Sequence, residues 1–222
     1  MWDAQEQYWK GYEWNHGGSQ PTVSVGFPGP TNSNDYPKNH SDTNHRYYNE
    51  SYPGYGVNNP ATHSSFNNVP NANELSWYVM YGDPRWDGDE LWTTMGHLYK
   101  GGMWLKKKSV LQAENHYDTE KSADNTTDMR TTRKAYNNIN SSIFYSGSPS
   151  VADASNYFYL PALGGYIIDI ISGIGSAGQY WSSSTDPWNS YYAYYLQFDS
   201  GRIYVSANAF RNMGFRVEPS FE

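Results

Sequence analysis

Four acidic side chains that stand close together are the first candidates for chemistry in this sequence. Asp83, Asp87, Asp89 and Glu90 fall within one short stretch. Carboxylates grouped in this way can bind calcium or act as an acid–base pair. Their spacing is not that of an EF-hand loop, and no second carboxylate cluster lies close by in the sequence. We therefore expect a turn followed by the first turn of a helix, where the helix dipole favours negative charge.

The other reactive residue types give no catalytic pattern. The six histidines lack the i, i+4 spacing of a helical metal site. The chain has no cysteine, which excludes disulfides, thiolate zinc sites and a cysteine nucleophile. The Gly-x-Ser-x-Gly motif of serine hydrolases is also missing from the sequence. The sequence therefore predicts a protein that is not an enzyme, with no cofactor and no metal site.

The composition predicts an aromatic core. The 222 residues include 22 Tyr, 9 Trp and 8 Phe. Aliphatic residues are few, but each large aromatic side chain can bury roughly 150–250 Å². A formal net charge of −7 without a basic stripe argues against a nucleic-acid partner. No run of about 18 apolar residues is present, so we expect no membrane insertion.

The first part of the chain, residues 1–70, is rich in Asn, Ser, Gly and Pro and poor in aliphatic residues. Such a composition predicts long loops that pack on a core. We expect the aromatic anchors of these loops to be Trp2, Tyr8, Trp9, Tyr12 and Trp14. Met1 precedes polar residues, not the charged and apolar regions of a signal peptide. We expect either that the protein is not exported or that its leader is absent from this chain.

Regular structure is predicted to begin with a helix after residue 70. Asn71 can cap this helix, Glu74 stands where a capping box needs it, and Gly82 ends it. A second helix is expected over residues 91–99, and loops over residues 112–155. Short strands are expected at residues 103–111, 157–160, 180–184 and 214–217.

The clearest pattern is a hairpin near the C-terminus. Residues 193–198 and 202–206 alternate around the turn Asp199-Ser200-Gly201. This alternation predicts an antiparallel meander that is buried on one face and wet on the other. We expect the side chains on the core face to be Leu196, Phe198, Ile203 and Val205. The side chains expected to point to solvent are Tyr195, Arg202, Tyr204 and Ser206.

Several linked motifs resemble one known family. They include Asn71-Ala-Asn-Glu-Leu, Leu91-Trp-Thr-Thr-Met-Gly-His-Leu-Tyr-Lys-Gly-Gly-Met-Trp, Tyr159-Leu-Pro-Ala-Leu-Gly, Tyr180-Trp-Ser-Ser-Ser and Arg211-Asn-Met-Gly-Phe-Arg-Val. Together they resemble the Fibrobacter-succinogenes-type major paralogous domain of Bacteroidetes surface proteins. That domain is related to the C-type-lectin-like fold of formylglycine-generating-enzyme relatives. The resemblance implies an α+β fold with two helices on a twisted antiparallel sheet and long loops.

The resemblance also implies a domain organisation. We expect one C-type-lectin-like domain over residues 1–222, with a family core at 71–219. The loop-rich part at 1–70 packs on that core. A variable face is expected at about residues 190–212.

Several chains of this family are variable proteins of diversity-generating retroelements, in which template adenines, typically in Asn codons, are replaced at random. Codons of this kind cannot yield Gln or Met, so Gln197 and Met213 fall outside the expected variable set. The resemblance implies that the ligand-binding residues are Tyr191, Tyr192, Tyr195, Asp199, Arg202, Tyr204, Ser206, Ala207, Asn208, Ala209, Phe210 and Asn212.

The implied function is recognition. The chain would be the ligand- or receptor-binding domain of a surface adhesin, at a pilus tip or as a phage receptor-binding protein. Its place would be the cell surface, the extracellular space or a virion, and its partner a protein or glycan receptor on another cell or phage host. The alternative is a carbohydrate-binding module of fixed specificity that uses Trp and Tyr platforms. The ligand and the oligomeric state stay open.

Overall fold

The computed structural model describes residues 1–6, 60–94, 96–167, 170–189 and 191–218. Over this part of the chain the protein is a mixed α+β protein, as the sequence predicts. Its elements in chain order are η2 (Ser64–Phe66), α1 (Ala72–Tyr81), β1 (Arg85–Thr94), β2 (His97–Lys106), α2 (Lys108–Ala113), β3 (Tyr136–Ile139), α3 (Ser141–Tyr145), η3 (Ala154–Asn156), β4 (Tyr157–Pro161), β5 (Leu163–Ile167), β6 (Ile170–Ile174), β7 (Ala177–Thr185), β8 (Tyr192–Asp199) and β9 (Arg202–Phe210).

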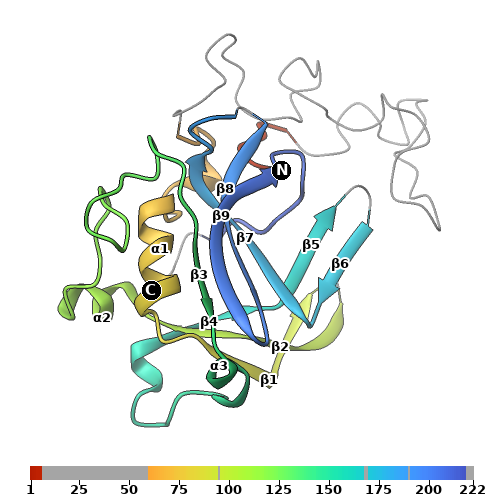
Figure 1. The fold of residues 1–222 in the computed structure, drawn as a ribbon. Coiled ribbons are helices and arrows are strands. Elements are labelled where there is room, and N and C mark those ends of the chain that lie inside the picture. Colours follow the sequence, from red (N-terminus) through yellow and green to blue (C-terminus); the bar gives the residue numbers. More distant parts are fainter. Residues whose placement is uncertain (7–59, 95, 168–169, 190, 219–222) are drawn as a thin grey trace, which may run out of the picture.

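The strands form two sheets. One has the order β1-β2-β4, and the other has the order β3-β9-β8-β7-β5-β6. Neighbouring strands are antiparallel apart from β5 and β7, which pair in parallel. Figure 1 shows α1 beside β8 and β9, the three-stranded sheet below them, and the hairpin of β5 and β6 projecting to one side. We call the face of the six-stranded sheet that packs on α1 the inner face, and the opposite face the outer face.

The predicted hairpin of β8 and β9 is confirmed, and so is its core side. One hydrophobic cluster fills the inner face and continues to the three-stranded sheet. The four residues expected in the core, Leu196, Phe198, Ile203 and Val205, are all 0% exposed. Successive side chains of a strand point to opposite faces of the sheet. These four apolar residues of the hairpin therefore share one face, and that face packs on α1.

Helix α1 forms where the sequence predicts it. The Asn71 side chain accepts a hydrogen bond from the Glu74 amide at 3.0 Å, and the Glu74 carboxylate accepts one from the Asn71 amide at 2.7 Å. This reciprocal pair is the predicted capping box. The three apolar side chains of its expected core face, Leu75, Tyr78 and Val79, are buried. The helix therefore begins at a satisfied cap and buries its apolar face against the sheet.

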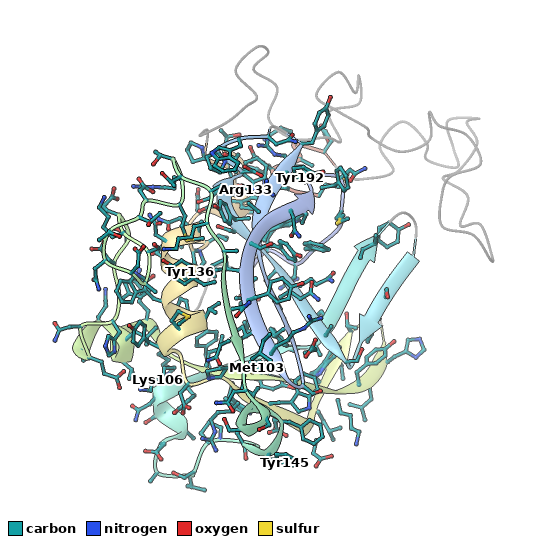
Figure 2. All side chains as sticks on the ribbon, in the orientation of Figure 1. Met103, Lys106, Arg133, Tyr136, Tyr145 and Tyr192 are labelled. Carbon is teal, nitrogen blue, oxygen red and sulfur yellow. The ribbon has the colours of Figure 1, made fainter. Side chains whose placement is uncertain are left out.

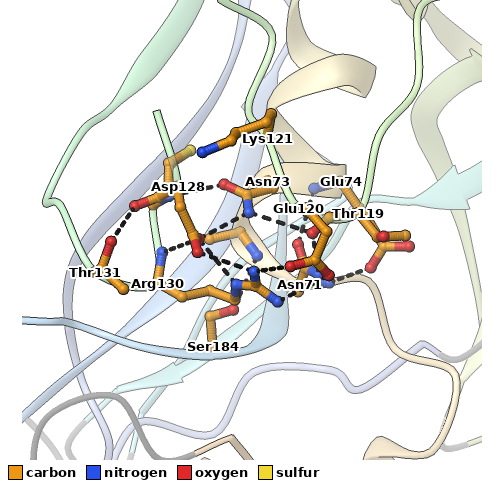
Figure 3. Close-up of polar contacts among 12 residues, drawn as sticks. Asn71, Asn73, Glu74, Thr119, Glu120, Lys121, Asp128, Arg130, Thr131 and Ser184 are labelled. Carbon is orange, nitrogen blue, oxygen red and sulfur yellow. Dashed lines mark hydrogen bonds and ion pairs between the residues drawn. The ribbon is translucent and has the colours of Figure 1, made fainter. Parts of the chain in front are cut away.

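A polar network ties the loop at residues 117–134 to the first turn of α1 (Figure 3). The Asn73 amide group donates to Asp128 at 3.0 Å and accepts from the Met129 amide at 2.8 Å. Arg130 donates from Nε to Asp128 at 2.8 Å and also binds Glu120. Burial alone would raise the pKa of Asp128, but these hydrogen bonds, from Arg130 above all, hold it at about 2. The loop is thus fastened to the helix by charge as well as by packing.

The helix expected over residues 91–99 is wrong, because this stretch is a hairpin of β1 and β2. Trp92 pairs with Tyr99 across it, and their rings stack with centroids 5.1 Å apart. Leu91 and Leu98 point away from that pair and are 60% and 64% exposed. Gly96 adopts a φ of +77° near the turn, a conformation that suits glycine. Apolar side chains therefore lie on both faces of this hairpin, Trp92 and Tyr99 on one and Leu91 and Leu98 on the other.

Three boundaries also differ from the sequence prediction. The strand expected at 103–111 ends at residue 106, where α2 follows. The region expected to be loop at 112–155 contains β3 and α3. The strand expected at 214–217 is reduced to two isolated bridges, Tyr166 with Gly214 and Tyr180 with Arg216. Its residues serve mainly as a cover for the outer face of the sheet.

The outer face carries a second hydrophobic cluster, built from both ends of the described chain. Trp2 and Phe66 come from the N-terminal part, Phe215 from the C-terminal part, and Trp181 and Tyr195 from the sheet. Trp2 is a buried anchor, as expected. The other four expected anchors, Tyr8, Trp9, Tyr12 and Trp14, lie outside the described residues.

Candidate binding surface

The acidic cluster of β1 is used for local structure. Asp87 is 9% exposed and accepts hydrogen bonds from the amides of Asp89 and Glu90 and from the Trp104 indole. The expectation of a helix first turn is therefore wrong, since these carboxylates lie on a strand. Among the described residues, no group of three or more His, Asp or Glu side chains could hold a metal ion. The cluster shapes an irregular stretch of β1.

The predicted variable residues fall into three classes of exposure. Four of them are exposed: Tyr191, Arg202, Asn208 and Phe210. Five are partly exposed: Tyr192, Asp199, Tyr204, Ser206 and Asn212. Three are buried: Tyr195, Ala207 and Ala209. Side chains of the third class cannot touch a ligand in this conformation, so the predicted set is too large.

Tyr195 was expected to point to solvent, and this expectation is wrong. The side chain is 6% exposed, and its ring contacts those of Trp181 and Phe215, with centroids at 6.4 and 5.3 Å. Burial raises the pKa of its hydroxyl. Its direction away from α1 was predicted correctly, but the outer cluster covers that face. Trp181 lies directly opposite Tyr195 on the neighbouring strand. Two large aromatic rings paired on one face of a sheet favour a layer that buries them, and this pair was the signal that the face is covered.

A bulge in β9 explains why the two buried alanines lie on opposite faces of the sheet. Between the pairs Ala193–Ala209 and Tyr195–Ser206, one residue of β8 faces Ala207 and Asn208 on β9. Such a bulge shifts the alternation of the strand. Ala207 accordingly packs in the inner cluster and Ala209 in the outer one. The sequence pattern gives no sign of this extra residue.

The bulge also separates residues that were expected to share a face. Tyr204 packs against the outer cluster, beside Tyr195. Ala209 belongs to that cluster too, so the next residue, Phe210, points to the opposite side. Phe210 and Tyr204 are therefore not parts of one sheet face. Tyr195, Tyr204 and Phe210, which all belong to the predicted variable set, therefore do not form one exposed patch.

Four aromatic side chains come from the residues before β8 and from the paired ends of β8 and β9, and we call them the aromatic patch. It consists of Trp188, Tyr191, Tyr192 and Phe210. Trp188 is 67% exposed, Tyr191 48% and Phe210 46%. Tyr192 and Phe210 are a cross-strand pair whose ring centroids lie 4.7 Å apart, tilted by 44°. The patch offers several large apolar surfaces close together to a partner.

Hydrogen bonds order the loop that carries the aromatic patch. The Asp186 carboxylate accepts from the Trp188 amide at 2.8 Å, and the Asn189 side chain accepts from the Tyr191 amide at 2.9 Å. The Tyr192 amide donates to the Asn189 carbonyl at 3.1 Å. These short local bonds fix the backbone from which the aromatic rings project.

Arg133 borders the aromatic patch and supports it from the side. Its Nε lies 3.3 Å from the fully buried carboxylate of Asp186, and its guanidinium lies 5.9 Å from the centre of the Trp188 ring. It also donates to the Ala207 carbonyl at 3.0 Å. Figure 2 shows Arg133 and Tyr192 at the same end of the molecule, away from Met103 and Tyr145. Sequence reasoning missed both Arg133 and Trp188, because neither lies in the alternating hairpin.

Of the other exposed members of the predicted set, Asn208 lies two residues before Phe210, and Arg202 lies at the other end of β9. Arg202 donates to Asp199 at 2.7 Å, and its guanidinium lies 5.5 Å from the Tyr204 ring. Eight residue steps separate Arg202 from Phe210, which is about 26 Å along a strand. The predicted set is therefore two groups, and the aromatic patch is the one with the larger exposed apolar surface.

Comparison with protein-family models, curated proteins and solved structures gave no match. No helix in the part of the chain that the structure describes is long and apolar enough to span a membrane. The functional argument therefore rests on the geometry of this surface and on the motifs of the sequence.

Proposed function

We propose that the chain is a C-type-lectin-like ligand-binding domain of a surface adhesin or phage receptor-binding protein, diversified by a retroelement, and that the aromatic patch is the centre of its binding surface. The observation that carries this proposal is a group of exposed aromatic side chains near the end of a packed hairpin, next to backbone amides that Asp186 and Asn189 bind. Its partner is a protein or glycan receptor on another cell or phage host. Tyr204 and Ser206, on the outer face, contribute at most to the rim.

The chemistry of the patch supports recognition. Tyr and Trp give large, rigid contact areas at a small cost in side-chain entropy. A few such residues can carry most of the affinity of an interface. Because Asp186 and Asn189 already order the loop, binding would not need to order it again. The inner cluster lies apart from the patch, so the patch can vary without unfolding the domain.

Selection from two display libraries tests this proposal. One library randomises Tyr191, Tyr192, Asn208 and Phe210. The control library randomises four exposed residues of the β1–β2 hairpin, namely Leu91, Thr93, Leu98 and Lys100. Both libraries are selected against folded proteins such as lysozyme and serum albumin. We expect specific binders from the first library and none from the second, whereas equal yields would refute a dedicated surface.

Diversification by a retroelement has its own test in the neighbouring DNA. We expect a near-copy of the 3′ end of the gene that differs from it only at adenines, together with a reverse-transcriptase gene. Differences at other bases would contradict the mechanism even if the surface binds ligands.

The alternative is a carbohydrate-binding module of fixed specificity, and Trp188 is the residue that favours it. Tryptophan cannot arise from randomised Asn codons, so Trp188 is a constant platform, and its ring is exposed. A glycan array and thermal shifts with and without calcium separate the two functions. One dominant glycan, lost in Trp188→Ala, would favour the fixed module.

A further inference from the structure

Arg211 follows β9 directly and lies beneath the aromatic patch, although it is fully buried. Its Nε donates a hydrogen bond to the Tyr192 carbonyl at 2.9 Å, and its amide donates to the Tyr191 carbonyl at 3.0 Å. One residue therefore holds the backbone of both tyrosines of the patch. Its neighbour in the chain, Phe210, stacks on Tyr192 and completes this arrangement.

Trp2 holds Arg211 from the other side. Its indole ring lies 4.6 Å from the guanidinium carbon, a cation–π contact that gains strength when it is buried. The Trp2 amide donates to the Arg211 carbonyl at 2.9 Å, and the indole nitrogen donates to the Ser182 carbonyl of β7 at 2.8 Å. The N-terminal segment is thus joined through Arg211 to the backbone of the patch.

The N-terminal segment is itself held in place by Asp3, which is 0% exposed. The Asp3 carboxylate accepts hydrogen bonds from the amides of Thr62 at 2.7 Å and His63 at 2.6 Å. Asp3 adopts a φ of +50°, a conformation rare for a residue other than glycine. The surrounding hydrogen bonds maintain this unfavourable backbone. Trp2 is therefore a fixed support for Arg211.

We infer that Arg211, braced by Trp2, is the positioning residue of the aromatic patch: it sets the backbone of Tyr191 and Tyr192 without touching the ligand. The planar guanidinium suits this role, because its donors have a fixed geometry and it stacks on an aromatic face. The inference rests on the proposed function only in taking the patch as the ligand-contacting surface. A residue that merely stabilises the fold would loosen the whole domain equally, so the two roles can be separated.

The lack of cysteine in the chain allows a test that needs no ligand. A single cysteine replaces exposed Asn208 on β9, or Thr93 on β1 as the control position, and carries a nitroxide spin label. Each labelled protein is made with Arg211→Met, which keeps the length of the side chain but removes the Nε donor and the charge. Leu105→Ala, in the inner cluster, serves as a destabilised control.

We expect Arg211→Met to increase the mobility of the label at position 208 and to leave the label at position 93 unchanged. Amide exchange at positions 211 and 186, whose hydrogen bonds end on the Tyr191 and Tyr192 carbonyls, should accelerate at least tenfold. Leu105→Ala should lower the melting temperature without mobilising position 208. Arg211→Lys should restore part of the order.

The inference would be overturned if the label at position 208 kept its mobility in Arg211→Met. It would also be overturned if Leu105→Ala mobilised that label as much as Arg211→Met does. If Arg211→Met does not fold, Trp2→Phe replaces it, since this change keeps a buried ring, removes the indole donor and weakens the cation–π contact with Arg211. It should mobilise position 208 to a smaller extent, and parent-like order there would again overturn the inference. None of these readouts involves ligand binding, so their failure would leave the library result standing, and the reverse is also true.

Discussion

The two faces of the six-stranded sheet share the hairpin of β8 and β9 but are covered in different ways. On the inner face, helix α1 covers aliphatic and aromatic side chains that alternate regularly along β9. On the outer face, Trp2, Phe66 and Phe215 come from distant parts of the chain and cover Tyr195 without an α-helix. The comparison teaches that alternation reveals which side chains share a face. It does not reveal whether the second face is wet.

The cover on the outer face changes where on the sheet a ligand could bind. If the outer face were wet, its middle would be the natural place for ligand contacts. Because Trp181, Tyr195 and Phe215 form a covered layer there, the most exposed aromatic residues of the hairpin and its flanking segments lie at its end. Variation at the patch then leaves both hydrophobic clusters intact, which a ligand-binding face in the middle of the sheet would not allow.

Two phenylalanines of the same hairpin give the largest expected contrast. Phe198 is fully buried on the inner face, and Phe210 is 46% exposed in the patch. We expect Phe198→Ala to lower the free energy of unfolding by about 3–5 kcal/mol, because it leaves a cavity in a packed core. Phe210→Ala should cost less than about 1 kcal/mol. Urea unfolding measures both, and equal losses would contradict the assignment of the two faces.

Gly178 on β7 tests how tightly the inner face is packed. A Cβ atom at this position would lie 2.1 Å from the Phe198 ring, which stacks on Tyr180. We expect Gly178→Ala to cost about 1–3 kcal/mol through overpacking. Gly201→Ala is the matched control, since the nearest atom to its Cβ is 3.9 Å away. A neutral Gly178→Ala would show that the ring has room to move.

The sequence predicted the inner face well because its signals are local. The Asn71 cap, the apolar face of α1 and the alternation along β9 each lie within a short stretch, and each is confirmed. The helix predicted at 91–99 was wrong because few aliphatic residues mark the period of this stretch, and its apolar positions fit a helix as well as a strand.

The outer face and the aromatic patch depend on contacts between distant residues. No local pattern places Trp2 on Arg211, or Arg133 beside Trp188. The bulge at Ala207 and Asn208 is likewise invisible in a run that alternates without a break. In the predicted variable set, Tyr191 and Phe210 are exposed, whereas Tyr195, Ala207 and Ala209 are buried.

Low pH should affect the inner and outer sides of the sheet differently, because two aspartates have pKa values that shift in opposite directions. Asp128, near α1, has its pKa held at about 2, below the unfolded value of about 3.9. Its charged form therefore stabilises the fold above about pH 4, and this contribution is lost as the pH falls towards 2. Burial raises the pKa of Asp3 in the outer layer despite its hydrogen bonds to Thr62 and His63, so protonation there favours the folded state.

The expected result follows from these signs. Protonation of Asp128 makes the free energy of unfolding fall between pH 6 and pH 2. In Asp128→Asn this fall should be smaller by up to about 2 kcal/mol. Asp3→Asn should make the loss steeper, because it removes a group that gains protons on folding. Urea unfolding at several pH values measures both slopes. Slopes that change in the same direction would show that one of the two environments is misassigned.

The smallest expected effect on stability is at the patch itself. Tyr191 is 48% exposed, and its backbone, not its ring, carries the hydrogen bonds to Asn189 and Arg211. We expect Tyr191→Ser to change the free energy of unfolding by less than about 0.5 kcal/mol. In a library-derived binder that retains Tyr191, the same change should weaken binding at least tenfold. Leu98→Ser, at an exposed apolar residue of the β1–β2 hairpin, is the control and should alter neither quantity. A large stability loss in Tyr191→Ser would mean that the patch is part of the core, and the division between a fixed scaffold and a free surface would then fail.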